Sequence, residues 1–235
     1  MGNSVGIKIH VFVIGVAVLL VGGGLAWKFG PWSERKPVPM TAKKENFFNR
    51  LKPAIASENQ RIRDLRDQLS SDQLDQGAIA QLAEQYRVEV TEDSEAVKAE
   101  LMLKVDEIPE SLALAQAAIE SQWGESRFAR EANNYYGQWC FEKGCGLVPK
   151  RRGEGKTHEV QTFGSLDESV RSYMLNLNRH PSYAELREIR ADMPEGERNG
   201  CDMAEGLLKY SEIGDDYIEM LKDVMGGNRL EASCS

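Results

Sequence analysis

The sequence has few of the side chains that metal enzymes and nucleic-acid-binding proteins need. Its 235 residues include three histidines and four cysteines, which leaves little material for a metal site. Lysine and arginine number 29 against 37 aspartates and glutamates, giving a formal net charge of −8 at pH 7. Because phosphate binding depends on clustered basic side chains, this balance argues against nucleic acid as a partner. We expect no metal and no other cofactor.

The chain has enough apolar residues to form a core. Hydrophobic residues make up 41% of it and charged residues 28%, which argues against a disordered chain and against a polytopic membrane protein. The length suits one or two domains.

One apolar run stands at the N-terminus. Val11 to Trp27 carries no charge and lies between Lys8 and Lys28. At about 1.5 Å per residue, a helix of this length just spans a hydrocarbon core of roughly 30 Å. Residues 1–28 are therefore predicted to be a transmembrane anchor or a cleaved signal segment. Either would place the rest in the cell envelope, anchored in the inner membrane and facing the periplasm, or exported.

Composition and periodicity divide the chain after residue 28 into three segments. Residues 29–41 are rich in proline and predicted to be a linker, 42–227 form the globular domain, and 228–235 form a flexible tail. Apolar residues recur at helical spacing over 46–86, and a capping box at Ser165 and Glu168 starts another helix, which Pro181 ends. Further helices are predicted over 109–123, 183–190, 202–210 and 216–225.

The segment from Tyr135 to Phe163 has no helical period and is predicted to form short strands and turns. The fold class is therefore mainly α (α+β), with a helical lobe, a small β-hairpin lobe and a groove between them.

Glu120 is the strongest candidate for chemistry. On a helix it lies at the edge of an apolar stripe, with Trp123 as its i+3 neighbour and the small Ala117 and Ala118 beside it. A carboxyl against an indole is partly desolvated, which raises its pKa. Such an acid suits glycoside hydrolysis, for which lysozyme is the standard example.

The residues around Glu120 resemble a known family. Ala115 to Gly124 reads AQAAIESQWG, and Asn133 to Gly137 reads NNYYG. These motifs resemble the bacterial glucosaminidases of glycoside hydrolase family 73, in the Bax-type branch (unrelated to the apoptotic protein of that name). The resemblance implies a lysozyme-like fold, endo-β-N-acetylglucosaminidase activity on the glycan strands of peptidoglycan, and Glu120 as general acid. The rivals are a lytic transglycosylase that forms anhydro-muramic products and a non-catalytic wall-binding protein.

The resemblance also implies partners for this acid. A second carboxylate is expected on the hairpin lobe, where Glu154 is preferred and Glu159 is the alternative; the substrate's own N-acetyl group could replace both. A tyrosine is expected in the C-terminal helices, with Tyr210 the best match and Tyr217 the second.

Three aromatic residues are candidates for stacking against sugar rings. They are Trp123, Tyr136 and Trp139, and packing under the hairpin is an equal alternative for the last two.

The four cysteines permit three pairings, which the sequence does not distinguish. In an oxidising compartment Cys140 could pair with Cys145 at a predicted turn, and Cys201 could pair with Cys234.

Overall fold

The structure is a computed structural model that describes residues 41–232 and Cys234, apart from Arg151, Glu154 and Glu195. The apolar segment 1–28 and most of the predicted linker lie outside this range. Among the described residues, no helix combines the length and the apolar character needed to cross a membrane.

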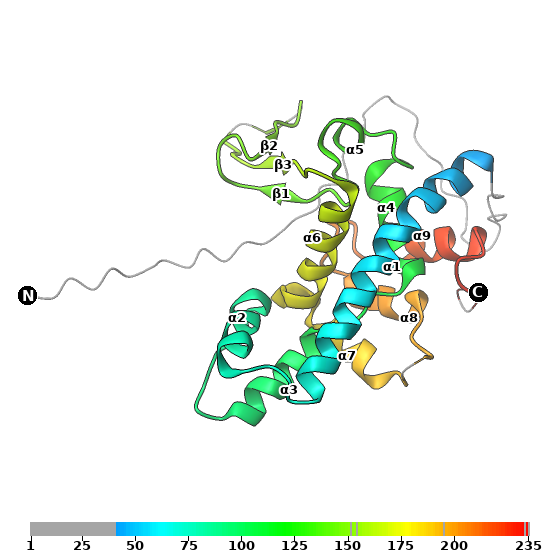
Figure 1. Ribbon diagram of the computed structural model, residues 1–235. Coiled ribbons are helices and arrows are strands. Elements are labelled where there is room, and N and C mark those ends of the chain that lie inside the picture. The colour runs from blue at the N-terminus through cyan, green and yellow to red at the C-terminus, as the bar shows by residue number, and fades with distance from the viewer. Residues whose placement is uncertain (1–40, 151, 154, 195, 233, 235) are drawn as a thin grey trace, which may run out of the picture.

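The described chain is mainly helical, with one small antiparallel sheet (Figure 1). Its helices are α1 (Ala42–Ser70), α2 (Gln76–Tyr86), α3 (Ser94–Lys104), α4 (Glu110–Ser121), α5 (Arg127–Ala132), α6 (Leu166–Arg179), α7 (Ala184–Asp192), α8 (Gly200–Ala204) and α9 (Asp215–Gly227), with short 3-10 turns η2 (Pro181–Tyr183) and η3 (Glu205–Leu207). The predicted helix start at Ser165 is confirmed, because its hydroxyl accepts a hydrogen bond from the Glu168 N–H and starts α6. The Glu168 carboxylate accepts from the Gly164 N–H at 2.8 Å, one residue before the position that a capping box requires.

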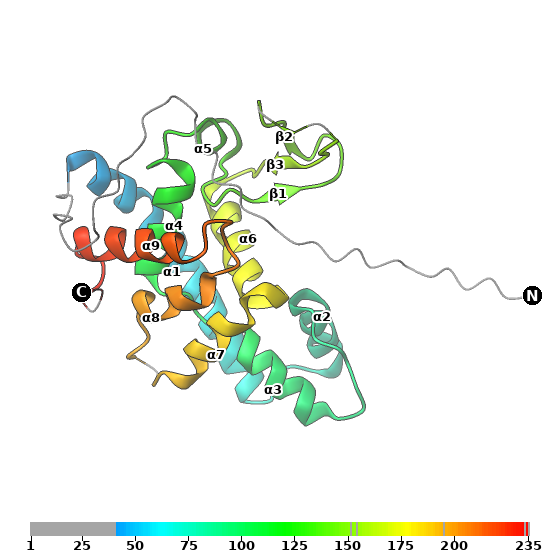
Figure 2. The same cartoon turned by 180° about the vertical axis from the view of Figure 1, so that it is seen from behind.

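Helix α4 forms the centre of the helical body. Every residue from Ser111 to Ala118 is buried. The long helix α1 packs along it, and α8 and α9 also contact it (Figures 1 and 2). A helix that is buried on all sides belongs to the core, and its position is fixed by its neighbours rather than by solvent. The predicted apolar stripe of α1 is confirmed, since Phe48, Leu51 and Ile55 are all buried.

The small sheet has strand order β1–β3–β2, formed by β1 (Trp139–Cys140), β2 (Gly146–Leu147) and β3 (Glu159–Gln161). Strand β3 therefore lies in the middle, and the lobe is a three-stranded sheet rather than the single hairpin that the sequence predicted. A Cβ atom on Gly146 would lie 2.0 Å from the carbonyl oxygen of Val160, so only glycine fits at this position of β2.

Two disulfides close loops of the described chain, and both pairings are among those that the sequence allowed. Cys140 pairs with Cys145 at the β1–β2 turn, and Cys201 on α8 pairs with Cys234.

The sequence predicts a flexible tail over 228–235. In the structure the Glu231 carboxylate accepts hydrogen bonds from the Ser111 hydroxyl at 2.8 Å and from the Gly200 N–H at 3.1 Å.

A buried ionic network fixes the chain just before α4. Asp106 accepts from Arg198 at 2.6 Å and lies 3.7 Å from the Nε atom of Arg190. The Arg190 side chain is 1% exposed, and it also donates to the side-chain oxygen of Asn178 at 2.7 Å. Burial lowers the pKa of Arg190 to about 10, an effect that the charge of Asp106 opposes. The network therefore contains a buried cation that depends on one carboxylate.

We expect Asp106→Asn to lower the free energy of unfolding by about 3 kcal/mol or more, because it leaves Arg190 buried without a counter-charge. Urea denaturation measures the change. Glu107→Gln is the matched control, since Glu107 pairs with Arg63 on the surface and is worth less than about 1 kcal/mol. Equal losses in the two variants would contradict the role given to Asp106.

Candidate active site

Glu120 lies half-buried at the C-terminal end of α4. The helix ends at Ser121, because Gln122 (φ 54°) and Trp123 (φ 60°) both adopt the left-handed conformation. The prediction that this helix reaches Trp123 is wrong. The turn is stabilised by the Ser121 hydroxyl, which donates to the carbonyl of Ala117 at 2.6 Å and accepts from a backbone N–H of the turn at 2.8 Å. The main chain after Glu120 is therefore tightly fixed.

A chain of buried hydrogen bonds ends on the Glu120 carboxylate. The Tyr217 hydroxyl on α9 donates to Oε1 of Glu120 at 2.8 Å. The side-chain amide of Gln116, one turn earlier on α4, donates from Nε2 to the Tyr217 oxygen at 3.1 Å. The Tyr173 hydroxyl on α6 donates to Oε1 of Gln116 at 2.6 Å. We call this the Tyr173–Gln116–Tyr217 chain.

The surroundings of Glu120 favour its protonated form. Burial raises the pKa of Glu120 from its ordinary value to about 7, while the hydrogen bond from Tyr217 acts in the opposite direction. Burial also holds the pKa of Tyr217 well above its usual value, so this phenol keeps its proton. The result is a carboxyl that can hold a transferable proton near neutral pH.

Tyr217, the second choice from the sequence, takes the place that was expected for Tyr210. The Tyr210 ring stacks on Tyr217 with centroids 5.5 Å apart, and its hydroxyl donates to the carbonyl of Tyr136 at 3.1 Å. Tyr136 is itself 0% exposed and stacks on Tyr173 at 3.8 Å. The Tyr136 ring is thus packed in the core.

The two tryptophans proposed for sugar binding are both partly exposed. Trp123 packs edge-on against Phe47 and Phe48 of α1, with centroids 5.8 and 5.5 Å away. The i+3 argument that placed it beside Glu120 required a continuous helix, which the structure does not have. Trp139 on β1 stacks on His158 at 3.9 Å.

Of the two candidate second carboxylates, Glu159 lies in the middle strand of the small sheet. Glu159 is buried on β3, where it accepts hydrogen bonds from the N–H groups of Gly144 at 3.1 Å and Gly146 at 2.9 Å. These bonds hold the pKa of Glu159 below its usual value. Its carboxylate therefore secures the turn between β1 and β2. Glu154, the preferred candidate, lies outside the described residues.

Sequence reasoning passed over Gln116, Tyr173 and Asn134. Gln116 was recognisable as a polar side chain four residues before Glu120 on an apolar helix. Asn134 lies in the NNYYG motif and explains part of it. Its amide donates to the carbonyls of Gln138 and Gln161, both at 2.8 Å, and so joins the segment after α5 to the end of β3.

One group of potential metal ligands occurs among the described residues. Ligand atoms of Cys140, Cys145 and Glu159 lie within 4.8 Å of one another. The two sulfur atoms are joined in a disulfide and the carboxylate is bound by backbone N–H groups, so this group does not offer a set of free ligands.

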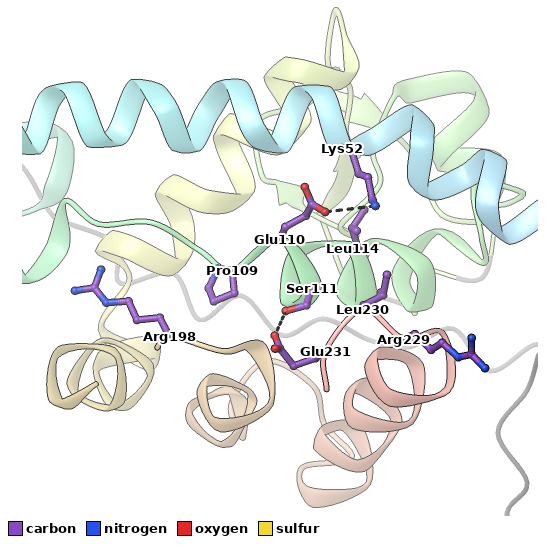
Figure 3. Close-up of a pocket in the computed structure, with 9 residues that line it drawn as sticks. All are labelled: Lys52, Pro109, Glu110, Ser111, Leu114, Arg198, Arg229, Leu230 and Glu231. Atoms are coloured by element: carbon purple, nitrogen blue, oxygen red, sulfur yellow. Dashed lines mark hydrogen bonds and ion pairs between the residues drawn. The ribbon is translucent and has the colours of Figure 1, made fainter. Parts of the chain in front are cut away.

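A pocket of about 290 Å³ lies at the opposite end of α4 from Glu120 (Figure 3). Figure 3 shows the Glu231 carboxylate turned towards Ser111, and Glu110 paired with Lys52. Of its charged groups, Lys52 and Glu110 pair with each other, and the position of the pocket separates it from the candidate acid.

The raised pKa of Glu120 predicts a pH-dependent cost to stability. A carboxyl whose pKa is about 7 in the folded protein and 4.5 when unfolded destabilises the fold as the pH rises from 4.5 to 7, and the full cost persists above 7. We expect Glu120→Gln to be more stable than the parent protein by about 2 to 3 kcal/mol at pH 8, and equally stable at pH 4. Urea unfolding at both pH values measures this. A difference that does not change with pH would contradict the assignment.

Comparison with known proteins places this site in a family. The family model described as glucosaminidase, mannosyl-glycoprotein endo-beta-N-acetylglucosaminidase, matches residues 96–230. The chain is also 32% identical over 197 residues to protein bax of Escherichia coli strain K12, an alignment that covers 80% of this chain and 70% of that protein. No solved structure matches. The family model spans Glu120 and its hydrogen-bond partners, and the chain therefore belongs to the glucosaminidase family, in its Bax-type branch.

Proposed function

We propose that the protein is an endo-β-N-acetylglucosaminidase with a lysozyme-like fold, which cleaves peptidoglycan glycan strands after N-acetylglucosamine. The observation that carries this proposal is the state of Glu120. Its carboxyl is half-buried, receives one hydrogen bond from Tyr217 and has a pKa raised to about 7. Membership of the glucosaminidase family supplies the substrate class.

In this mechanism Glu120 donates its proton to the oxygen of the leaving sugar as the glycosidic bond breaks. The departing alcohol is a poor leaving group unless it is protonated, so the reaction needs an acid that still holds its proton at neutral pH. Partial exposure lets the carboxyl meet the substrate, while burial keeps it protonated. Tyr217 holds one carboxylate oxygen in place during the transfer.

The second carboxylate of this mechanism is assigned to Glu154. Glycosidases commonly use such a group to activate water or to attack the anomeric carbon. Glu159 suits the task less well, because its oxygens accept backbone hydrogen bonds from Gly144 and Gly146. Where no carboxylate reaches the bond, the N-acetyl group of the substrate can act as the nucleophile. Neither route requires a cofactor.

The location proposed for this activity is the cell envelope. Residues 1–28 would anchor the chain in the inner membrane with the domain facing the periplasm, or direct its export. Both disulfides of the described chain suit an oxidising compartment.

We expect Glu120→Gln to lose at least about 100-fold in the rate at which purified cell walls are cleared, because the amide N–H is far too weakly acidic to transfer a proton to the leaving oxygen. Mass spectrometry of the digest by the parent protein should show new reducing N-acetylglucosamine ends. Glu125→Gln is the control, since Glu125 is exposed and pairs with Lys43. Full activity of Glu120→Gln would contradict the proposal. Anhydro-muramic ends would indicate a lytic transglycosylase, and intact walls with retained binding would indicate a non-catalytic wall-binding protein.

Glu154→Gln tests the second role. We expect kcat to fall by about 100-fold with little change in KM, because the water or the anomeric centre loses its carboxylate. Steady-state kinetics on soluble glycan fragments measure this. Glu142→Gln, a change of the same kind at an exposed position between β1 and β2, should keep the parent rate. An unchanged kcat in Glu154→Gln would transfer the role to the N-acetyl group of the substrate.

A further inference from the structure

The Tyr173–Gln116–Tyr217 chain lies entirely in the core behind Glu120. Gln116 and Tyr217 are 0% exposed and Tyr173 is 1% exposed. Buried polar side chains are costly unless every group is paired, so a buried chain of three such residues behind one carboxyl calls for an explanation.

The hydrogen bonds of the Tyr173–Gln116–Tyr217 chain all run in one donor-to-acceptor direction, towards Glu120. A side-chain amide has an acceptor end and a donor end, and its orientation follows from its partners. The Tyr173 hydroxyl donates to Oε1 of Gln116, which leaves Nε2 facing Tyr217. The Tyr217 oxygen accepts from that Nε2, and its single proton then points to Oε1 of Glu120.

This direction has a consequence for the acid. When Glu120 is protonated, its Oε1 already receives the Tyr217 proton, so the transferable proton resides on Oε2. We propose that Gln116, held by Tyr173, is a positioning residue that keeps the Tyr217 proton on Oε1 of Glu120 and thereby confines the transferable proton to Oε2. The inference deepens, and rests on, the proposed function of Glu120 as general acid.

The opposite orientation of the amide shows what the chain prevents. Oε1 of Gln116 would then face Tyr217 and accept its proton. Glu120 would then no longer accept a hydrogen bond from Tyr217. Its own O–H would instead donate a hydrogen bond to the Tyr217 oxygen, so that the proton points into the core rather than towards a substrate. Two measurable changes follow: fewer molecules hold a proton on Oε2, and the ionised form of Glu120 is less stabilised.

The groups that face Glu120 from the surrounding elements are phenols. They come from α6, η2, the segment after η3, and α9, and they are Tyr173, Tyr183, Tyr210 and Tyr217. Burial raises the pKa of each, so all four are neutral at the pH of interest.

Charged side chains at the start of α1 and on α8 have contacts of their own. Lys43 and Lys44 of α1 contact Glu125 and the Trp123 ring, respectively. On α8, Asp202 accepts a hydrogen bond from the Asn199 side chain. Among the described residues, the hydrogen bond from Tyr217 is thus the contact that offsets the burial of Glu120.

The experiment compares Tyr173→Phe and Gln116→Met with the parent protein, by measuring kcat/KM on purified peptidoglycan as a function of pH. Tyr173→Phe removes the hydroxyl that orients the amide, and Gln116→Met removes the amide with little change in volume. We expect kcat/KM to fall about five- to tenfold, and the alkaline limb of the kcat/KM–pH profile to move up by about half a pH unit to one unit. A packing defect alone would lower the rate without moving the limb.

Tyr183→Phe is the matched control, because it removes the hydroxyl of another buried tyrosine near Glu120. Tyr183 does not belong to the Tyr173–Gln116–Tyr217 chain, and its hydroxyl bonds to Asn176. Its alkaline limb should coincide with that of the parent protein. Thermal unfolding identifies any variant that does not fold, and Tyr173→Phe decides the question if Gln116→Met is such a case. The inference would be overturned if the alkaline limb coincides with that of the parent protein in Tyr173→Phe and in Gln116→Met, or in whichever of the two folds.

A second measurement separates this inference from the proposed function. If Glu120→Gln is fully active, the proposed function fails. The orienting role of the Tyr173–Gln116–Tyr217 chain is then tested by 13C NMR titration of the Glu120 side-chain carboxyl without substrate. Midpoints above that of the parent protein in Tyr173→Phe and Gln116→Met support the orienting role. Unchanged midpoints overturn it.

Discussion

The active-site structure depends on a balance at one carboxyl group. Burial at the C-terminal end of α4 disfavours the charge of Glu120, and the Tyr217 hydroxyl restores part of its stability through a hydrogen bond of 2.8 Å. Without the burial, Glu120 would be ionised at neutral pH and could not act as an acid. Without the hydrogen bond, its pKa would rise further and its proton would be harder to give up.

The rest of the fold keeps that balance in place. Helix α4 is enclosed by α1, α8 and α9, so its end cannot move independently of the core. Asp106 and Arg190 fix the chain before the helix, and the left-handed turn at Gln122 and Trp123 fixes it afterwards. The cost is a half-buried acidic group that destabilises the fold above pH 4.5. Under the proposed function, this is stability given up for activity. The disulfides contribute in the opposite direction.

The sequence predicted those features that local patterns determine. The start of α6 at Ser165, the apolar stripe of α1 and the β-rich segment after Tyr135 all follow from spacing and composition, and the structure confirms them. Helices α3 and α5 were not predicted, and α8 is shorter than expected.

The composition of the site was harder to predict, because it joins residues that are distant in sequence. Glu120 stood out through its motif, but which tyrosine reaches it depends on how α9 packs against α4. That packing brings Tyr217 to the carboxylate and leaves Tyr210 stacked behind it. The end of α4 was also misplaced, because two consecutive left-handed residues that are not glycine have no clear sequence signal.

The central claim is that Glu120 carries a proton at neutral pH in the folded protein. Titration of its 13C-labelled side-chain carboxyl by NMR, with Glu120→Gln used to assign the signal, tests this most directly. We predict a midpoint of about 7. A midpoint near the ordinary value of 4.5 would contradict it.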